Sequence, residues 1–86
     1  MNMLKDMILT EIEGEYYAVP VGEAAKQFSG MIRMNGTGKR IFELLTEGRD
    51  ENGVVRQLTE EYDVDEATAR ENVGAFLNKL RGAGLL

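Results

Sequence analysis

The stretch GMIRMNGTGKRIFELLTEG, residues 30–48, changes from one pattern to another within a few residues. Gly30–Met34 is a short apolar run that follows a glycine, which predicts a strand. Beyond it, Asn35 or Thr37 can cap a helix that we expect over Thr37–Glu47, and Gly48 can end that helix. The stretch therefore predicts a strand that leads directly into a helix, and it raises the question of what pairs with the edge of that strand.

The predicted helix has an apolar stripe at i, i+3, i+4 spacing. The stripe consists of Ile41, Phe42, Leu44 and Leu45.

Upstream, two further strands are expected. MILTEIE, residues 7–13, alternates in part, and YYAVPV, residues 16–21, is rich in aromatic and β-branched side chains. Gly14–Glu15 between them suits a type II′ hairpin, which has glycine at its first central position. Pro20 cannot donate to a ladder, so the second strand should end there or face outward. Residues 22–28 form a connector with at most one loose helical turn.

Downstream, two more helices are expected. Glu51–Tyr62 follows Asp50 as its N-cap, and its inner face carries Val54, Val55, Leu58 and Tyr62. Glu66–Arg81 follows Asp65 as its N-cap and ends at Gly82 as the C-cap. Its apolar face carries Ala69, Val73, Phe76, Leu77 and Leu80, and the terminal Leu85 and Leu86 should pack back onto the protein.

The order is three strands and then three helices, an α+β fold in which one face of a three-stranded antiparallel sheet packs on the helices. Such a fold is winged-helix-like, with its strands first. A chain of 86 residues suggests one domain, residues 1–86, with a small core.

Composition argues against an enzyme. The chain has no Cys and no His, so it lacks thiolate ligands and the commonest general base and metal ligand. The glycines around Gly36–Arg40 do not form a phosphate-binding loop. We therefore expect no catalytic residue, no metal and no cofactor. No stretch approaches a membrane span or a signal peptide, so we expect a cytoplasmic protein.

Charge is unevenly spread along the chain, whose net charge is −5. Residues 47–71 hold nine acidic side chains, whereas residues 24–42 hold Lys26, Arg33, Lys39 and Arg40 and no acid. DNA binding, the natural guess for two consecutive helices of the helix-turn-helix kind, is disfavoured because the acidic segment EEYDVDE before the last helix would repel phosphates. The basic residues would instead attract an acidic partner.

Peptide binding fits the predicted third strand better. Its outer edge is left without a neighbour, and an unpaired edge can template an incoming strand. Met is an adaptable residue that suits variable partners. By alternation only one of Met31 and Ile32 can face the core, and Met34 can serve the core or the start of the following helix.

The two stretches at residues 30–48 and 58–86 resemble the PqqD-like family, small proteins and domains called RiPP recognition elements. The resemblance covers about residues 15–86. It rests on the order and spacing of Met34–Asn35, TGKRIFELL (37–45), EEYDV (60–64), VGAFLNKL (73–80) and the final GLL (84–86).

The resemblance implies a non-catalytic adaptor that binds the leader segment of a ribosomally synthesised precursor peptide and presents it to a modifying enzyme, often a radical SAM protein. The leader would add as a strand beside the third strand and lie against the third helix. The residues implied are Gly30, Met31, Ile32, Arg33 and Met34 on the strand, with Arg70, Val73, Phe76 and Leu77 chosen on the helix.

Two positions depart from the family pattern. Asn72 stands where relatives commonly have Asp, so a contact there would lose its charge, and Met34 replaces a more usual Leu of similar volume.

Two other interpretations stay open at this point. One is a winged-helix DNA-binding or regulatory domain, and the other is a homodimer that pairs its third strands edge to edge.

Overall fold

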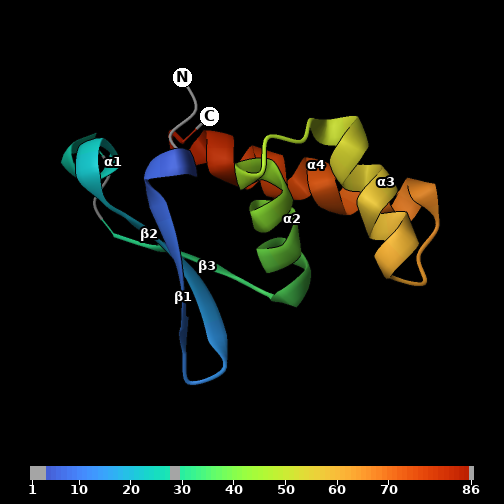
Figure 1. Ribbon diagram of the computed structural model, residues 1–86, viewed down its shortest axis with the longest axis horizontal. Coiled ribbons are helices and arrows are strands. Elements are labelled where there is room, and N and C mark those ends of the chain that lie inside the picture. The colour runs from blue at the N-terminus through green and yellow to red at the C-terminus, as the bar shows by residue number, and fades with distance from the viewer. Residues whose placement is uncertain (1–3, 28–29, 86) are drawn as a thin grey trace.

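The computed structural model describes residues 4–27 and 30–85. A short 3-10 helix η1 (Leu4–Asp6) leads into the strands β1 (Met7–Ile12) and β2 (Glu15–Pro20). The helix α1 (Gly22–Gln27) precedes β3 (Ile32–Met34), and three longer helices follow, α2 (Gly36–Thr46), α3 (Glu51–Glu61) and α4 (Glu66–Gly82). A three-stranded antiparallel sheet followed by helices confirms the predicted α+β, winged-helix-like class (Figure 1).

The sheet has the order β1-β2-β3, so β3 is an edge strand. Tyr17 of β2 lies opposite Arg33 of β3, and Ala18 lies opposite Ile32. In Figure 1 the β1–β2 hairpin extends away from the helices, while β3 leads straight into α2. The free edge of β3 therefore lies beside the helical half of the molecule.

The hairpin turn differs from the prediction. Ile12 pairs with Glu15, so the two central residues are Glu13 and Gly14 rather than Gly14 and Glu15. Both have positive φ, 52° and 84°, which is the type I′ geometry rather than type II′. A type I′ turn matches the right-handed twist of the strands, and this match holds Glu13 in a conformation that L residues with long side chains rarely adopt.

The segment before β3 also differs from the prediction. Gly30 has a φ of 100°, which turns the chain, and the strand begins only at Ile32, two residues later than expected. The expected connector contains the regular helix α1 over residues 22–27, and Phe28 lies outside the described residues. Pro20 ends β2, as its missing N–H requires.

Asparagine or aspartate caps each of the three longer helices. Asn35 Oδ1 accepts from the Gly38 N–H at 2.8 Å, and Asp50 and Asp65 make the same contact three residues on, at 2.8 and 2.7 Å. Asn35, not Thr37, is therefore the cap that begins α2. At the other end of the chain α4 runs through Gly82, and the residue with positive φ is Gly84.

One apolar cluster joins the sheet to the helices. The sheet contributes Met7, Ala18, Ile32 and Met34, and the helices contribute the apolar stripes predicted for them, except that Tyr62 is exposed and Leu45 is only partly buried. Leu85 is fully buried, whereas Leu86 lies outside the described residues. Ile32 is the core residue of the pair Met31–Ile32, and Met31 is exposed.

Candidate functional site

A hollow of about 320 Å³, here termed the groove, opens where β3, the first turn of α2 and the middle of α4 meet. Its lining consists of Met34, Asn35, Thr37, Gly38, Ile41, Asn72, Ala75, Phe76 and Lys79. The α4 members lie at positions i, i+3, i+4 and i+7, which is one flank of a helix. The groove therefore combines residues about forty positions apart in the sequence, brought together by the packing of α2 against α4.

The groove has an apolar floor and a polar rim. Met34, Ile41 and Phe76 are nearly buried side chains at its base. Asn72 and Lys79 are exposed on the α4 side. An apolar lining with a few polar groups around it is the usual make-up of a ligand-binding site.

Gly38 sets how closely the walls approach. A Cβ on this residue would lie 3.1 Å from Met34 Cβ and 3.2 Å from Phe76 Cε1, which is tighter than ordinary packing. Gly38 thus favours the close approach of α2 to β3 and α4, and the same residue donates its N–H to the Asn35 cap.

Strand β2 pairs with one edge of β3, and the other edge pairs with no strand of the described residues. On the side of the groove, the ammonium of Lys79 donates to the main-chain carbonyl of Arg33. Since Lys79 lines the groove, the carbonyl that it reaches faces the groove as well. The edge of β3 and the groove therefore form one continuous surface.

The predicted site residues do not all lie in the groove, and Arg33 of β3 pairs with Glu15. Met34 and Phe76 line the groove, and Ile32 is buried beside them in the core. Gly30 and Met31 are exposed but precede β3, so they belong to the segment that enters the edge. Their role as peptide contacts stays a prediction.

The remaining predicted helix residues lie away from the groove. Val73 and Leu77 are buried in the core and do not line the groove. Arg70 is exposed and donates to Asn52 Oδ1 at 3.1 Å on α3. The flank of α4 that faces β3 is instead the one bearing Asn72, Ala75 and Lys79, which the apolar periodicity does not mark.

All four basic residues within residues 24–42 form ion pairs with nearby acidic side chains. The pairs are Lys26 with Glu23 at 3.2 Å, Arg33 with Glu15 at 2.7 Å, Lys39 with Glu43 at 3.9 Å and Arg40 with Glu61 at 2.6 Å. Lys39 also lies 4.9 Å from the centre of the Tyr16 ring. The attraction for an acidic partner predicted from these four side chains is correspondingly reduced.

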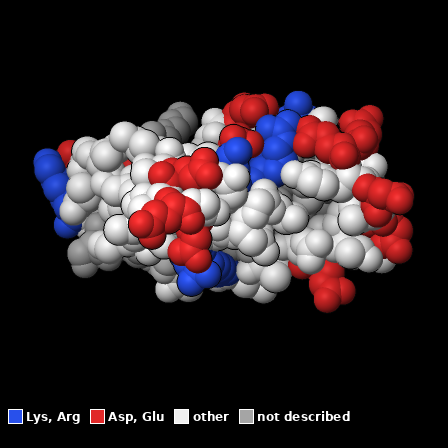
Figure 2. All heavy atoms as spheres, turned by 90° about the horizontal axis from the view of Figure 1, so that it is seen from below, with Lys and Arg blue, Asp and Glu red and all other residues white. Residues whose placement is uncertain are grey.

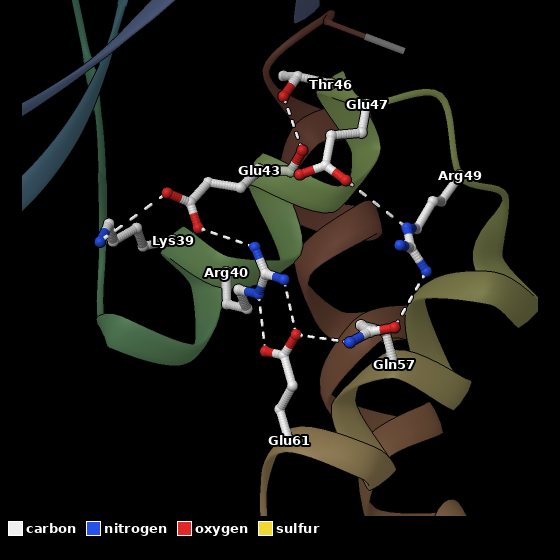
Figure 3. A network of polar contacts seen from close by, with 8 residues as sticks. All are labelled: Lys39, Arg40, Glu43, Thr46, Glu47, Arg49, Gln57 and Glu61. Atoms are coloured by element: carbon white, nitrogen blue, oxygen red, sulfur yellow. Dashed lines mark hydrogen bonds and ion pairs between the residues drawn. The ribbon is translucent and has the colours of Figure 1, made fainter.

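A polar network ties α2 to α3 (Figure 3). The Arg40 guanidinium donates to both carboxylate oxygens of Glu61, at 2.7 and 2.6 Å, and Gln57 donates to the same carboxylate at 2.7 Å. The hydrogen bonds from Arg40, and then from Gln57, lower the pKa of Glu61 to about 2. The same pairing raises the pKa of the Arg40 guanidinium. Arg40 and Glu61 are therefore both charged at every ordinary pH.

The end of the molecule at which α3 passes into α4 is acidic. Figure 2 shows carboxylates crowding this end, while lysines and arginines are scattered among acids elsewhere on the face shown. The joining segment carries exposed Asp63 and Asp65, with Glu60 and Glu66 beside them. The hydrogen bonds from Thr68 hold the pKa of Asp65 below its ordinary value, so this carboxylate keeps its charge.

The described residues contain no cluster of three or more Asp, Glu, His or Cys able to hold a metal ion. No helix within residues 4–27 and 30–85 is both long and apolar enough to cross a membrane.

Residues 6–86 match the family described as coenzyme PQQ synthesis protein D (PqqD). The chain belongs to the PqqD family. This match confirms the resemblance seen in the sequence, and it spans the sheet, the groove and all three longer helices.

A solved structure described as TbiB1 in complex with the TbiA(beta) leader peptide resembles this PqqD-family chain. The TM-score is 0.75 at 24% sequence identity, with 100% of this chain and 94% of the other covered. At that identity the likeness establishes the fold. A comparison with curated proteins gave no match.

Proposed function

We propose that this PqqD-family protein is an adaptor that binds the leader segment of a ribosomally synthesised precursor peptide. The leader adds as a strand to the free edge of β3, places a side chain in the groove, and is presented to a modifying enzyme such as a radical SAM protein. The observation that carries the proposal is the continuity of the free β3 edge with an apolar-floored groove. The family match and the TbiB1 complex with a leader peptide support it.

Strand addition suits this surface because the β3 edge and the groove would contribute differently to binding. Main-chain hydrogen bonds to β3 would provide affinity for any extended peptide, and the groove would select side chains. The groove, at about 320 Å³, lies at the small end of the range for ligand sites. A hollow of this size has room for an anchoring apolar side chain.

Glu61 and Asp65 are not suited to act as general acids. A general acid near neutral pH needs a raised carboxyl pKa, whereas the pKa values of Glu61 and Asp65 are lowered by their hydrogen bonds. The chain also contains no His and no Cys. Chemistry on the precursor would come from the modifying enzyme.

DNA binding is less well supported by the charges. The helix that would enter a groove of DNA is α4, and its N-terminal end bears Asp65 and Glu66 beside the acidic joining segment. These carboxylates would repel the phosphate backbone.

The proposal is tested by an amide-shift titration of isotope-labelled protein with the leader half of a precursor encoded beside its gene. We expect shifts concentrated on Ile32–Met34, on the first turn of α2 and on the groove flank of α4. A peptide of the same composition in scrambled order is the matched control. Shifts that spread evenly, or equal shifts with the scrambled peptide, would argue against a specific site, and saturable, salt-sensitive shifts on adding duplex DNA would support the other class of function.

A further inference from the structure

Lys79 occupies a special place in the groove. Among the described residues that line it, Lys79 is the one with a positive charge. The nearby Arg33 and Lys39 pair with Glu15 and Glu43, whereas the Lys79 ammonium donates to the Arg33 carbonyl oxygen. Within residues 4–27 and 30–85, Lys79 is therefore a cation that contacts a main-chain carbonyl and pairs with no carboxylate.

The Arg33 carbonyl is also the group that an added strand would need. A β-ladder is built from N–H donors of one strand and C=O acceptors of the next. In the free protein the Lys79 ammonium already satisfies this acceptor at the groove edge of β3. Natural edge strands are commonly protected by lysine against unwanted pairing. Lys79 gives β3 such protection from the neighbouring helix.

We propose that Lys79 is an exchangeable cap on the β3 edge and selects leader peptides that carry a carboxylate two residues from their apolar anchor, on the same face of the added strand. A main-chain N–H of the incoming strand takes over the Arg33 carbonyl, and the released ammonium pairs with an Asp or Glu of the peptide. The apolar side chain beside that acid rests on Met34, Ile41 and Phe76. This inference rests on the proposed function and adds the class of peptide.

The exchange explains why charge matters although the contact is exposed. When a neutral peptide displaces the Lys79 ammonium from the Arg33 carbonyl, the ammonium is left with water as its partner. An acidic peptide instead offers the ammonium a carboxylate. Hydrogen bonds to charged groups exceed neutral ones in strength, but exposed pairs are weakened by solvent. We expect wild-type protein to bind an acidic peptide about three- to tenfold more tightly than its amide analogue, in which Asn or Gln replaces the acid.

The capping contact is testable without any peptide. In Lys79→Met, which keeps an apolar stem and loses the ammonium, the carbonyl-carbon shift of Arg33 and the amide shift of Met34 should change. The matched control is Arg81→Met, an exposed cation two residues along α4 that does not line the groove. Equal shifts at Arg33 in both variants would overturn the capping role.

Selectivity is tested by selecting a displayed library of random dodecapeptides on the full protein. Peptides enriched by wild type should share an apolar residue with an acid two residues away, and Lys79→Met should enrich peptides without the acid. A selected peptide and its amide analogue are then measured on both proteins. Lys79→Met should bind the acidic peptide and its amide analogue with about equal affinity. The amide analogue should bind Lys79→Met at least as tightly as it binds wild type.

The outcomes separate the two proposals. Enriched peptides that shift β3 but show no acid, or an acid preference that survives in Lys79→Met, would overturn the selection by Lys79 and leave leader binding standing. If wild-type protein enriches no peptide and gives no shifts on β3, both proposals fail.

Discussion

A bulky side chain placed inside the groove should weaken peptide binding without unfolding the protein. Ala75 is exposed on α4 and lines the groove. In Ala75→Phe the aromatic ring would enter a hollow of about 320 Å³ and occupy part of it. An incoming apolar side chain would then lose its seat. We therefore expect binding, rather than folding, to be the property that changes.

The size of the effect follows from the burial that the peptide loses. Burying one apolar side chain contributes about 1.5–3 kcal/mol. At about 1.4 kcal/mol for each factor of ten, Ala75→Phe should weaken binding roughly 10- to 100-fold. The cost to folding is the lower helix propensity of Phe, about 0.5 kcal/mol, which corresponds to a fall in Tm of about 2–4 °C.

Ala67→Phe is the matched control. Ala67 is exposed on the same helix and does not line the groove, so the same substitution should cost the same stability and leave binding unchanged. Binding of a labelled peptide selected on wild type can be followed by fluorescence anisotropy, and Tm by circular dichroism. If Ala75→Phe and Ala67→Phe bind this peptide with equal affinity, the groove is not the anchor site.

Three further substitutions test other features of the structure. Asn35→Ala should lower stability by about 1 kcal/mol through the lost cap and also weaken peptide binding, whereas Asp50→Ala should cost similar stability, measured by urea unfolding, and leave binding intact; equal binding by both would contradict a link between this cap and the groove. Glu13→Asn should raise Tm, because Asn tolerates the positive φ of a type I′ turn, and a lower Tm would refute that assignment. The Glu61 pKa is lowered from 4.5 to about 2. Its pairing with Arg40 therefore stabilises the fold fully at pH values above 4.5, and this stabilisation is lost as pH falls through about 2. The stability difference between wild type and Arg40→Gln should therefore shrink on acidification toward pH about 2, and a difference independent of pH would disprove the pairing.

Local patterns were sufficient to predict the part of the fold from β3 onward. The apolar run ending at Met34, the Asn35 cap and the stripe on α2 are each fixed by neighbours a few residues away. The type of the hairpin turn was predicted wrongly because it depends on the strand register. The register makes Glu13 and Gly14 the two central residues, so Gly14 is the second of them and not the first. Local sequence does not show which of two adjacent residues starts the loop.

The site was harder to predict for a physical reason. Periodicity marks Val73 and Leu77 because they are apolar, but such residues on α4 face the core. The groove flank is identified by where β3 and α2 pass the helix, and its members Asn72, Ala75 and Lys79 are ordinary surface residues in the sequence. Their spacing at i, i+3 and i+7 would have shown that they share one flank, but not that this flank faces a strand edge.

The ion network of Arg40 and Glu61 has a consequence for how fast and how freely a peptide can dock. It fastens α2 to α3, and α3 packs along α4, so both walls of the groove belong to one braced unit before any peptide arrives. A receptor that is already shaped loses little conformational entropy on binding, and the ordering cost falls on the peptide. We expect association rates in the range of rigid-surface docking, about 10⁵–10⁷ M⁻¹s⁻¹, with differences among leaders expressed mainly in how long each one stays.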